Sequence, residues 1–403
     1  MRDTSLRVLY LHPAASFGGA SKSLVELFSC LQGRGVEGVV LSPVGTASEA
    51  FVRAGMALRP VRGLSQFDNT RYSFYRKLRW IILLRELFLL PSSLSGLWRL
   101  RGESYDLIHI NEITLLPVGV VAKWLLRVPL VVHVRSLQRK PGSGWRTGWI
   151  NGLLRRYADL VVAIDHTVAA SLEADLPVRV IHNGLTVDQK LSLSSAKSDQ
   201  DLVRVGFLGV LIPLKGVFEL IQAMCLLKQR GVQVECVIAG ENARHLSGIK
   251  AWILGKLGFA RDVRAELEAL IRREGLESHV KLLGFVQDVR ELYPQLDILC
   301  FPSHLDAAGR PVFEAAFYSV PSVVAVSNPM PDALLHEATG LAVPTPDPKL
   351  IADALQRLVE EPEFRRQLGR QAKVWAEETF AIDANAARML DLYRHVLSST
   401  ASR

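Results

Sequence analysis

The sequence of 403 residues contains few cysteines and no closely spaced pair of them. The four cysteines stand singly within apolar helix or strand patterns, at Cys30, Cys225, Cys236 and Cys300. Because no Cys-x-x-Cys pair occurs, neither a zinc site nor a disulfide framework is supported. We therefore expect a cytoplasmic protein in a reducing compartment.

A long uninterrupted apolar run is also missing. Met1 leads directly into a predicted strand at 6–12, without the apolar core of a signal peptide. The most apolar stretch, residues 71–101, is broken by Arg85, Glu86 and Pro91, so it falls short of the roughly 20 residues that a spanning helix needs. With seven basic residues against one acidic residue, this stretch is basic and amphipathic. It either lies on an anionic bilayer at the inner face of the membrane or packs as a helix that leads into the next strand.

The fingerprint of a dinucleotide site is absent as well. Phe17-Gly18-Gly19-Ala20 follows the first predicted strand, and paired glycines at such a turn allow a ligand to approach the backbone closely. The pattern is not Gly-x-Gly-x-x-Gly, and no acidic residue closes the next strand, so NAD is not expected. A tight turn without a ligand is the alternative. No set of metal ligands stands out, and we expect no metal and no cofactor.

The positive charge is concentrated in the first half of the chain. The net charge is +8, and residues 1–190 hold 24 basic against 14 acidic residues, whereas the remainder holds 24 against 26. This asymmetry indicates an anionic partner or membrane surface on the side of the first half, or else a merely solvated basic surface.

Short apolar runs alternate with helical stretches along the whole chain, which is typical of α/β architecture with parallel sheets. The runs predict strands buried on both faces, at 6–12, 38–43, 107–110, 130–134, 160–164, 178–181, 203–208, 234–239, 280–283, 298–301, 322–326 and 341–343. The chain is too long for one ordinary core, and the polar, Ser-rich stretch 185–200 is the best linker. We predict two Rossmann-like doubly wound domains, 1–190 and 200–380, that face a ligand-binding cleft. A C-terminal helix at 381–403 is expected to pack back toward the first domain.

The segment from Asp306 to Glu314 gives the strongest indication of chemistry. A buried strand is predicted just before it, and a helix is predicted to open at Pro311. Gly309 allows close approach of a ligand, and the helix N-terminus favours an anion. Carboxylates on both sides of an anion site are unfavourable unless they bind something else, such as hydroxyls. Phosphate together with hydroxyls indicates a nucleotide sugar.

Two further residues end or follow predicted strands. Lys215 ends a loop just before Gly216, where a compact positive charge can neutralise a diphosphate leaving group; an ordinary exposed lysine is the alternative. His133 ends the strand at 130–134, facing the predicted cleft, unless it is only a satisfied core histidine. His109 and His12 also end or nearly end predicted strands, but the sequence gives weaker grounds for a functional role at these two positions.

A Gly/Pro/Ser-containing loop is expected within residues 135–156, which hold six basic residues and no acidic one. Its Arg and Trp side chains suit a lid or a clamp on the acceptor. A simple exposed loop is equally compatible with the sequence.

Together these pieces resemble the large retaining glycosyltransferase family known as family 4, which has the GT-B fold. The resemblance covers nearly the whole chain and rests on motifs in the right order, namely Gly18-Gly19-Ala20, Asp106-Leu-Ile-His109, Ile181-His-Asn-Gly-Leu-Thr-Val-Asp188, Lys215-Gly216, Gly284-Phe-Val286, Leu296-Asp-Ile-Leu-Cys-Phe-Pro-Ser303, Thr339-Gly-Leu-Ala-Val-Pro344 and Glu361-Pro-Glu-Phe-Arg365.

The resemblance implies a role for each motif. Glu314 would hold the ribose hydroxyls, Asp306 would sit by the donor sugar, and Lys215 would hold the diphosphate. His133 would approach the transferred sugar. We expect donor binding at Gly18, Gly19, Gly309, Arg310, Val312 and Glu314, and catalysis at Asp306, His133 and Lys215.

The chain departs from the family pattern at two positions. Val210 stands where the family usually has an arginine, six residues before the glycine of Lys-Gly, and Arg310 or Arg135 is the candidate to replace its charge. Asp306 replaces a glutamate and so retracts the carboxylate. An additional basic amphipathic stretch, 242–262, is expected to contact membrane or acceptor, or to cover part of the second domain.

The sequence thus predicts a glycosyltransferase that moves a sugar from a nucleoside diphosphate sugar to a hydroxyl, with retention of configuration. The basic first half favours an anionic acceptor, lipid-linked or polysaccharide, and no nucleic acid. Two alternatives stay open: a sugar-nucleotide-binding protein without transferase activity, and a nucleotide-sugar epimerase of the same build.

Overall fold

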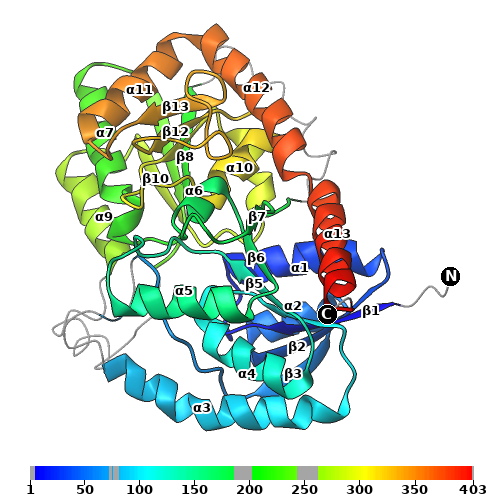
Figure 1. The fold of residues 1–403 in the computed structure, drawn as a ribbon. Coiled ribbons are helices and arrows are strands. Elements are labelled where there is room, and N and C mark those ends of the chain that lie inside the picture. The colour runs from blue at the N-terminus through cyan, green and yellow to red at the C-terminus, as the bar shows by residue number, and fades with distance from the viewer. Residues whose placement is uncertain (1–4, 72–74, 76–80, 186–201, 243–261, 402–403) are drawn as a thin grey trace. The chain divides into compact units, whose positions relative to one another are not determined.

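The computed structural model describes residues 5–71, 75, 81–185, 202–242 and 262–401 (Figure 1). The chain divides into two compact units, one formed by Met1–Thr186 with Phe380–Arg403 and the other by Val187–Thr379. The predicted linker beyond Leu185 and the interior of the predicted insertion at 242–262 lie outside the described residues.

The first unit is built on a seven-stranded parallel sheet. Its strands are β1 (Leu6–Leu11), β2 (Val36–Pro43), β3 (Ala57–Val61), β4 (Leu107–Ile110), β5 (Leu130–Val134), β6 (Leu160–Ala163) and β7 (Val178–Val180). Their order is β3-β2-β1-β4-β5-β6-β7, so the order reverses between β1 and β4. Ligands of doubly wound sheets bind outside the carboxyl ends of the strands at such a reversal.

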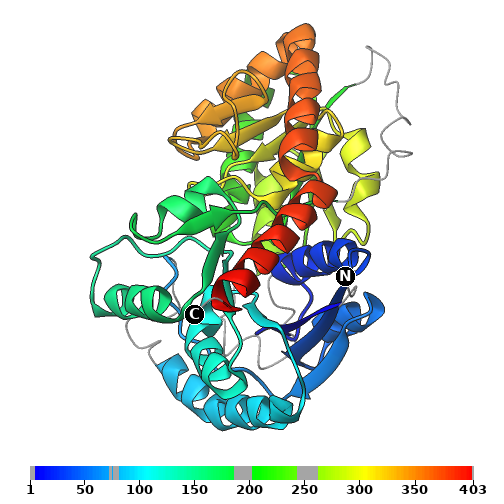
Figure 2. The ribbon, with the colours of Figure 1, turned by 45° about the vertical axis from the view of Figure 1, so that its right-hand side comes forward.

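Helices cover both faces of this sheet. They are α1 (Gly19–Gln32), α2 (Thr46–Arg53), α3 (Ile82–Arg99), α4 (Leu116–Leu126), α5 (Trp145–Tyr157), the short α6 (His166–Ala170) and α13 (Ile382–Ala401). On one face α1 buries Leu24, Leu27, Phe28 and Leu31, at helical spacing, in a core that α13 also enters. Figure 2 shows α13, in red, lying beside α1, in blue. The core on the other face takes residues from α3, α4 and α5.

The second unit has a six-stranded parallel sheet in the order β10-β9-β8-β11-β12-β13. Its strands are β8 (Val203–Leu208), β9 (Val234–Ala239), β10 (Val280–Gly284), β11 (Ile298–Phe301), β12 (Ser322–Ala325) and β13 (Gly340–Val343). Its helices are α7 (Val217–Gln229), α9 (Val263–Arg273), α10 (Arg310–Phe317), α11 (Pro348–Glu360) and α12 (Pro362–Phe380). α7, α9 and α11 pack on one face and α10 on the other, and the strand order reverses between β8 and β11.

The predicted fold class, α/β with two Rossmann-like parallel-sheet domains, is confirmed. One strand was not predicted: β3 contains Arg59 and Pro60 and is mostly half-exposed. It lies at the edge of the sheet, where a strand can include proline and needs no continuous apolar run. α10 begins at Arg310, one residue before the predicted start at Pro311. No helix among the described residues is long and apolar enough to cross a membrane.

Candidate functional site

In the second unit, the loop after β8 leads to Lys215 and Gly216 at the point where the strand order reverses. Gly216 has φ of 75°, in the left-handed region. A Cβ atom there would lie 1.6 Å from the carbonyl oxygen of Pro302, just after β11. Only glycine allows the two loops to approach so closely. The Lys-Gly pair is thus fixed against the loop that leads to α10.

Lys215 is a partly buried cation. Its Nζ lies 4.9 Å from the centroid of the Phe301 ring, and burial lowers the pKa of its ammonium group. Among the residues that the structure describes, no carboxylate forms an ion pair with Lys215. A half-buried ammonium group without a carboxylate partner favours an anionic ligand.

The N-terminus of α10 lies against the same aromatic ring. Gly309 precedes the helix, and a Cβ atom there would lie 2.3 Å from the Phe301 ring. No side chain caps this N-terminus, and the positive end of a helix favours an anion. Pro311 has no N–H, the Val312 amide donates to the Gly309 carbonyl, and the Val312 side chain is buried in the core. Lys215 and the first turn of α10 therefore flank one ring, Phe301.

Glu314, one turn into α10, is held by two neighbours. Arg310 Nε donates to its Oε1 at 2.8 Å, and the Tyr293 hydroxyl donates to its Oε2 at 2.7 Å. Tyr293 is buried and stacks on Tyr318, with ring centroids 5.6 Å apart. Arg310 is thus already paired with a carboxylate. Arg310 was, with Arg135, a candidate to replace the charge that is missing at the exposed Val210, and its guanidinium forms an ion pair with Glu314.

Asp306 lies in the loop before α10 with φ of 52°. Its Oδ1 accepts hydrogen bonds from the backbone amide of Ser327, at 2.8 Å, and from the Ser327 hydroxyl, at 3.0 Å. Asp306 therefore ties this loop to the chain after β12. Neither Ser327 nor Tyr293 was predicted, because both are joined to the site by contacts over 21 residues of sequence that no local pattern reveals.

In the first unit, Gly18 and Gly19 lie at the start of α1, where the strand order reverses after β1. Both are exposed, and a Cβ atom at either position would meet no atom within 4 Å. The first turn of α1 has no acidic residue and no side-chain cap. This open backbone at a helix N-terminus suits an anion or a hydroxyl-rich ligand.

Three histidines at the ends of β1, β4 and β5 are buried: His12, His109 and His133. Burial and the nearby Arg135 guanidinium lower the pKa of His12 and of His109 to about 3, and they also lower the pKa of His133. All three imidazoles are therefore neutral near pH 7. Arg135 is held by Asn111, through its Nε at 2.9 Å from the amide oxygen, and by Asn183, through its Nη1 at 2.6 Å.

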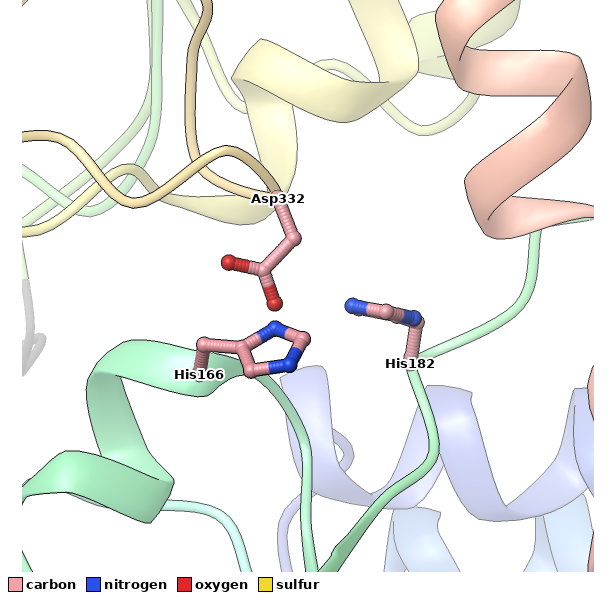
Figure 3. A group of neighbouring side chains, drawn as sticks. All are labelled: His166, His182 and Asp332. Atoms are coloured by element: carbon pink, nitrogen blue, oxygen red, sulfur yellow. The ribbon is translucent and has the colours of Figure 1, made fainter.

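Two other histidines of the first unit, His166 and His182, lie with ring centroids 6.1 Å apart (Figure 3). His166 opens α6, and the His182 ring also packs edge-on against Phe380, at 5.3 Å. In the sequence, His182 was noted only as part of the motif Ile181–Asp188, and neither histidine was assigned a role.

The segment at 135–156 is only partly a loop. The helix α5 occupies its second half, beginning at Trp145. Trp145 and Trp149 are exposed on α5, and the Phe67 ring contacts both of them.

The helix α3 exposes most of its large apolar side chains and buries Leu97 together with two polar residues. Its buried residues include Glu86, which accepts a hydrogen bond from the Gln66 amide, and Ser93, whose hydroxyl accepts one from the Ser65 amide. Its large exposed side chains are Leu84, Leu87, Phe88, Leu90, Leu94 and Trp98, preceded by Ile81. Arginines border this face: the Arg62 guanidinium lies over Phe88, and that of Arg101 over Trp98.

Known proteins resemble the chain over most of its length. The family described as "Glycosyl transferase 4-like domain" matches residues 18–184, and "Glycosyl transferases group 1" matches residues 188–375. An uncharacterized glycosyltransferase of Methanocaldococcus jannaschii is 25% identical over 72% of this chain and 76% of its own length. A D-inositol 3-phosphate glycosyltransferase of Saccharomonospora viridis is 27% identical, covering 73% of this chain and 71% of the relative. The crystal structure of Anabaena HepE in complex with UDP and glucose shares the fold, with a TM-score of 0.72 at 22% identity over 97% of this chain and 100% of that chain.

Proposed function

The chain belongs to the group 1 glycosyltransferases, with a glycosyl transferase 4-like first domain and the GT-B fold, and from this premise we propose that it transfers a sugar from a nucleoside diphosphate sugar to a hydroxyl acceptor with retention of configuration. The donor binds in the second unit, and the acceptor binds on the side of the first unit.

The observation that carries the donor assignment is the partly buried, carboxylate-free Lys215 beside the Phe301 ring that also contacts Gly309. An ammonium group and an uncapped helix N-terminus around one ring form a site for a diphosphate. HepE, which shares the fold, has been crystallised with UDP and with UDP-glucose, which supports a nucleotide sugar as donor.

Glu314 gives this donor a second point of attachment. Its carboxylate is fixed by Arg310 and Tyr293, so it can accept hydrogen bonds from ribose hydroxyls without reorganising. Asp306, which Ser327 holds in the loop between β11 and α10, is proposed to lie beside the donor sugar.

The chemistry needs no nucleophile from the protein. The bond between the anomeric carbon and the diphosphate oxygen breaks, and the acceptor oxygen forms a new bond on the same face. The acceptor proton passes to the departing phosphate oxygen. Lys215 and the α10 amides stabilise the negative charge that develops on the diphosphate. No metal and no cofactor take part in this proposal.

The acceptor is proposed to be lipid-linked and reached at an anionic membrane surface. The exposed apolar side chains of α3 carry this part, because a helix that exposes Phe88 and Trp98 at its surface offers apolar area to a partner. An exposed tryptophan and bordering arginines suit the headgroup region of an anionic bilayer. The enzyme would thus act as a peripheral membrane protein in the synthesis of a cell-surface glycan.

Thermal-shift measurements with UDP-, GDP- and ADP-sugars test the donor site. A ligand that binds only the folded protein raises its stability by RT ln(1 + [L]/Kd). We expect one nucleotide class to stabilise the wild type and to lose this effect in Glu314→Ala, but not in Glu377→Ala, which removes an exposed carboxylate from α12 of the same unit. If no nucleotide sugar stabilises the wild type, the donor assignment is wrong. Binding without transfer to any acceptor would favour the sugar-nucleotide-binding alternative.

A further inference from the structure

Buried hydrogen bonds link the C-terminal helix to His133 in the first unit. The Tyr393 hydroxyl on α13 lies 2.6 Å from His109 Nδ1, and His109 Nε2 lies 3.1 Å from His133 Nδ1. All three side chains are buried, with exposed fractions of 0% for Tyr393 and His109 and 1% for His133. The other ring nitrogen, His133 Nε2, is buried and has no hydrogen-bond partner among the described residues.

The direction of this chain of hydrogen bonds follows from Arg135. Its Nη2 lies 3.3 Å from His133 Nδ1, and a guanidinium group can only donate. His133 Nδ1 must therefore be an acceptor, so the proton of this neutral ring is on Nε2. The same acceptor faces His109 Nε2, which must then be the protonated nitrogen of His109. His109 Nδ1 is left as an acceptor, and the Tyr393 hydroxyl donates to it.

We propose that Tyr393 is a positioning residue: by donating to His109 Nδ1 it keeps the His109 proton on Nε2, and His109 and Arg135 together then hold His133 as the Nε2–H tautomer, a fixed hydrogen-bond donor to an oxygen of a sugar bound by the first unit. Tyr393 is the one group in this chain of hydrogen bonds that lies on α13, 284 positions from His109 in sequence. A buried N–H without a protein partner calls for an acceptor from outside the chain. The contact with the sugar rests on the proposed function, whereas the tautomers do not.

Nuclear magnetic resonance of the ring nitrogens tests the tautomers in the ligand-free protein. With ¹⁵N-labelled histidine, the signals of the two rings are assigned by their loss in His109→Gln and His133→Gln. We expect protonated Nε2 and unprotonated Nδ1 in both rings of the wild type. In Tyr393→Phe the shifts of His109 should move toward a mixture of tautomers, since its Nδ1 loses the donor. Protonation of His133 at Nδ1, or unchanged shifts in Tyr393→Phe, would overturn the proposal.

The kinetics of sugar transfer test whether this chain of hydrogen bonds contributes to binding of the sugar. We expect Tyr393→Phe to lower kcat/KM by about fivefold or more, because a buried polar group loses its partner. Tyr105→Phe is the matched control, since it removes a buried tyrosine hydroxyl from the other core of the same unit and should leave kcat/KM unchanged. Wild-type kcat/KM in Tyr393→Phe together with altered tautomers would contradict the link to the sugar. No turnover by the wild type with any donor would contradict the proposed function and leave the tautomer result standing.

Discussion

Lys215 and Gly216 are adjacent in sequence but have different roles. The lysine supplies a positive charge that no described carboxylate neutralises, whereas the glycine lets the backbone pass the Pro302 carbonyl. The first is a matter of electrostatics and the second of sterics, so substitutions at the two positions should fail in different ways.

Lys215→Ala should lower kcat on the order of 10²–10³-fold, the usual effect of removing one group that stabilises developing negative charge. The melting temperature should not fall, because Lys215 holds no described carboxylate and a half-buried ammonium group is lost. Initial rates with a nucleotide sugar, together with a thermal scan, measure both effects. Lys349→Ala, at an exposed position of α11, is the control. Near-normal rates in Lys215→Ala would refute the assignment.

Gly216→Ala should destabilise the second unit much more than Gly231→Ala. Both glycines have φ of 75°, but an added Cβ atom meets the Pro302 carbonyl oxygen at 1.6 Å in the first case and no atom within 4 Å in the second. Gly231→Ala should cost about 1–2 kcal/mol, from the left-handed backbone alone. Urea unfolding measures the free energy of unfolding of both variants. The difference between them gives the cost of the steric clash, apart from the cost of the left-handed backbone. Equal losses would show that the loops can separate without cost.

At this scale the sequence predicted the positions of the charged and glycine residues better than their partners. Lys215 and Gly309 lie in the segments that follow strands, and Glu314 lies one turn into the helix after Gly309. A strand end is visible as the end of an apolar run. The contacts of Glu314 with Tyr293 and of Asp306 with Ser327 depend on how loops fold over one another, which no local period encodes.

Among the elements, α3 is the one whose environment the sequence left undecided. Periodicity shows that a helix has an apolar and a polar side, but not which of them the protein buries. Here two backbone amides of the loop before α3 need acceptors, and Glu86 and Ser93 provide them. The face that carries Glu86 and Ser93, together with Leu97, is therefore turned inward.

The double variant Leu87→Glu/Phe88→Glu should abolish binding to vesicles rich in phosphatidylglycerol and leave the melting temperature unchanged, because both side chains are more than half exposed, at 56% and 65%. Co-sedimentation with anionic and with neutral vesicles measures the binding. Val374→Glu, which adds a charge at an exposed apolar position of α12 in the other unit, should still bind. Undiminished sedimentation of the double variant would show that α3 is not the membrane-facing element.

The strands were the most predictable elements, since those covered on both faces are almost entirely apolar. β3 departs from this rule because an edge strand has one neighbour and a half-exposed surface. A C-terminal helix was expected at 381–403, and α13 begins at Ile382, just after Ala381, which pairs with Leu185 in an isolated bridge.

For the whole molecule, the first unit is completed by the last segment of the chain. α13 places Ala386, Met389, Leu390, Tyr393 and Val396 in the core that also holds Leu24 and Phe28 of α1. Removing residues 381–403 should therefore leave the first unit unable to fold stably. Each large buried side chain contributes about 1.5–3 kcal/mol, against a total stability of about 5–15 kcal/mol.

Soluble yield and calorimetry of this truncated chain measure the loss, and we expect the transition of the first unit to disappear. A chain that stops at Ser398 should behave as the full protein, because the side chains of Ser399 and Thr400 are exposed. A truncated chain with two intact transitions would contradict the role of α13.

The buried neutral histidines should make the first unit sensitive to acid. The pKa is lowered to about 3 in the fold for His12 and His109, against about 6.5 in an unfolded chain. Between these values the unfolded chain binds more protons, so the free energy of unfolding falls as the pH drops below about 6.5, by up to about 1.4 kcal/mol per pH unit for each histidine. Urea unfolding from pH 5 to 8 checks this, and His109→Gln should show a shallower slope. An identical slope would exclude His109 as a contributor.

The position of α13 also has a consequence for synthesis on the ribosome. Nascent chains usually fold domain by domain, from the N-terminus onward. Here the first sheet cannot be completed until nearly all of the 403 residues have been translated. Until then, the apolar surface that α13 covers is exposed. The second unit, which is continuous in sequence from Val187 to Thr379, can fold before the first one is finished. A premature stop within α13, before the codon for Tyr393, would thus damage the beginning of the protein rather than its end.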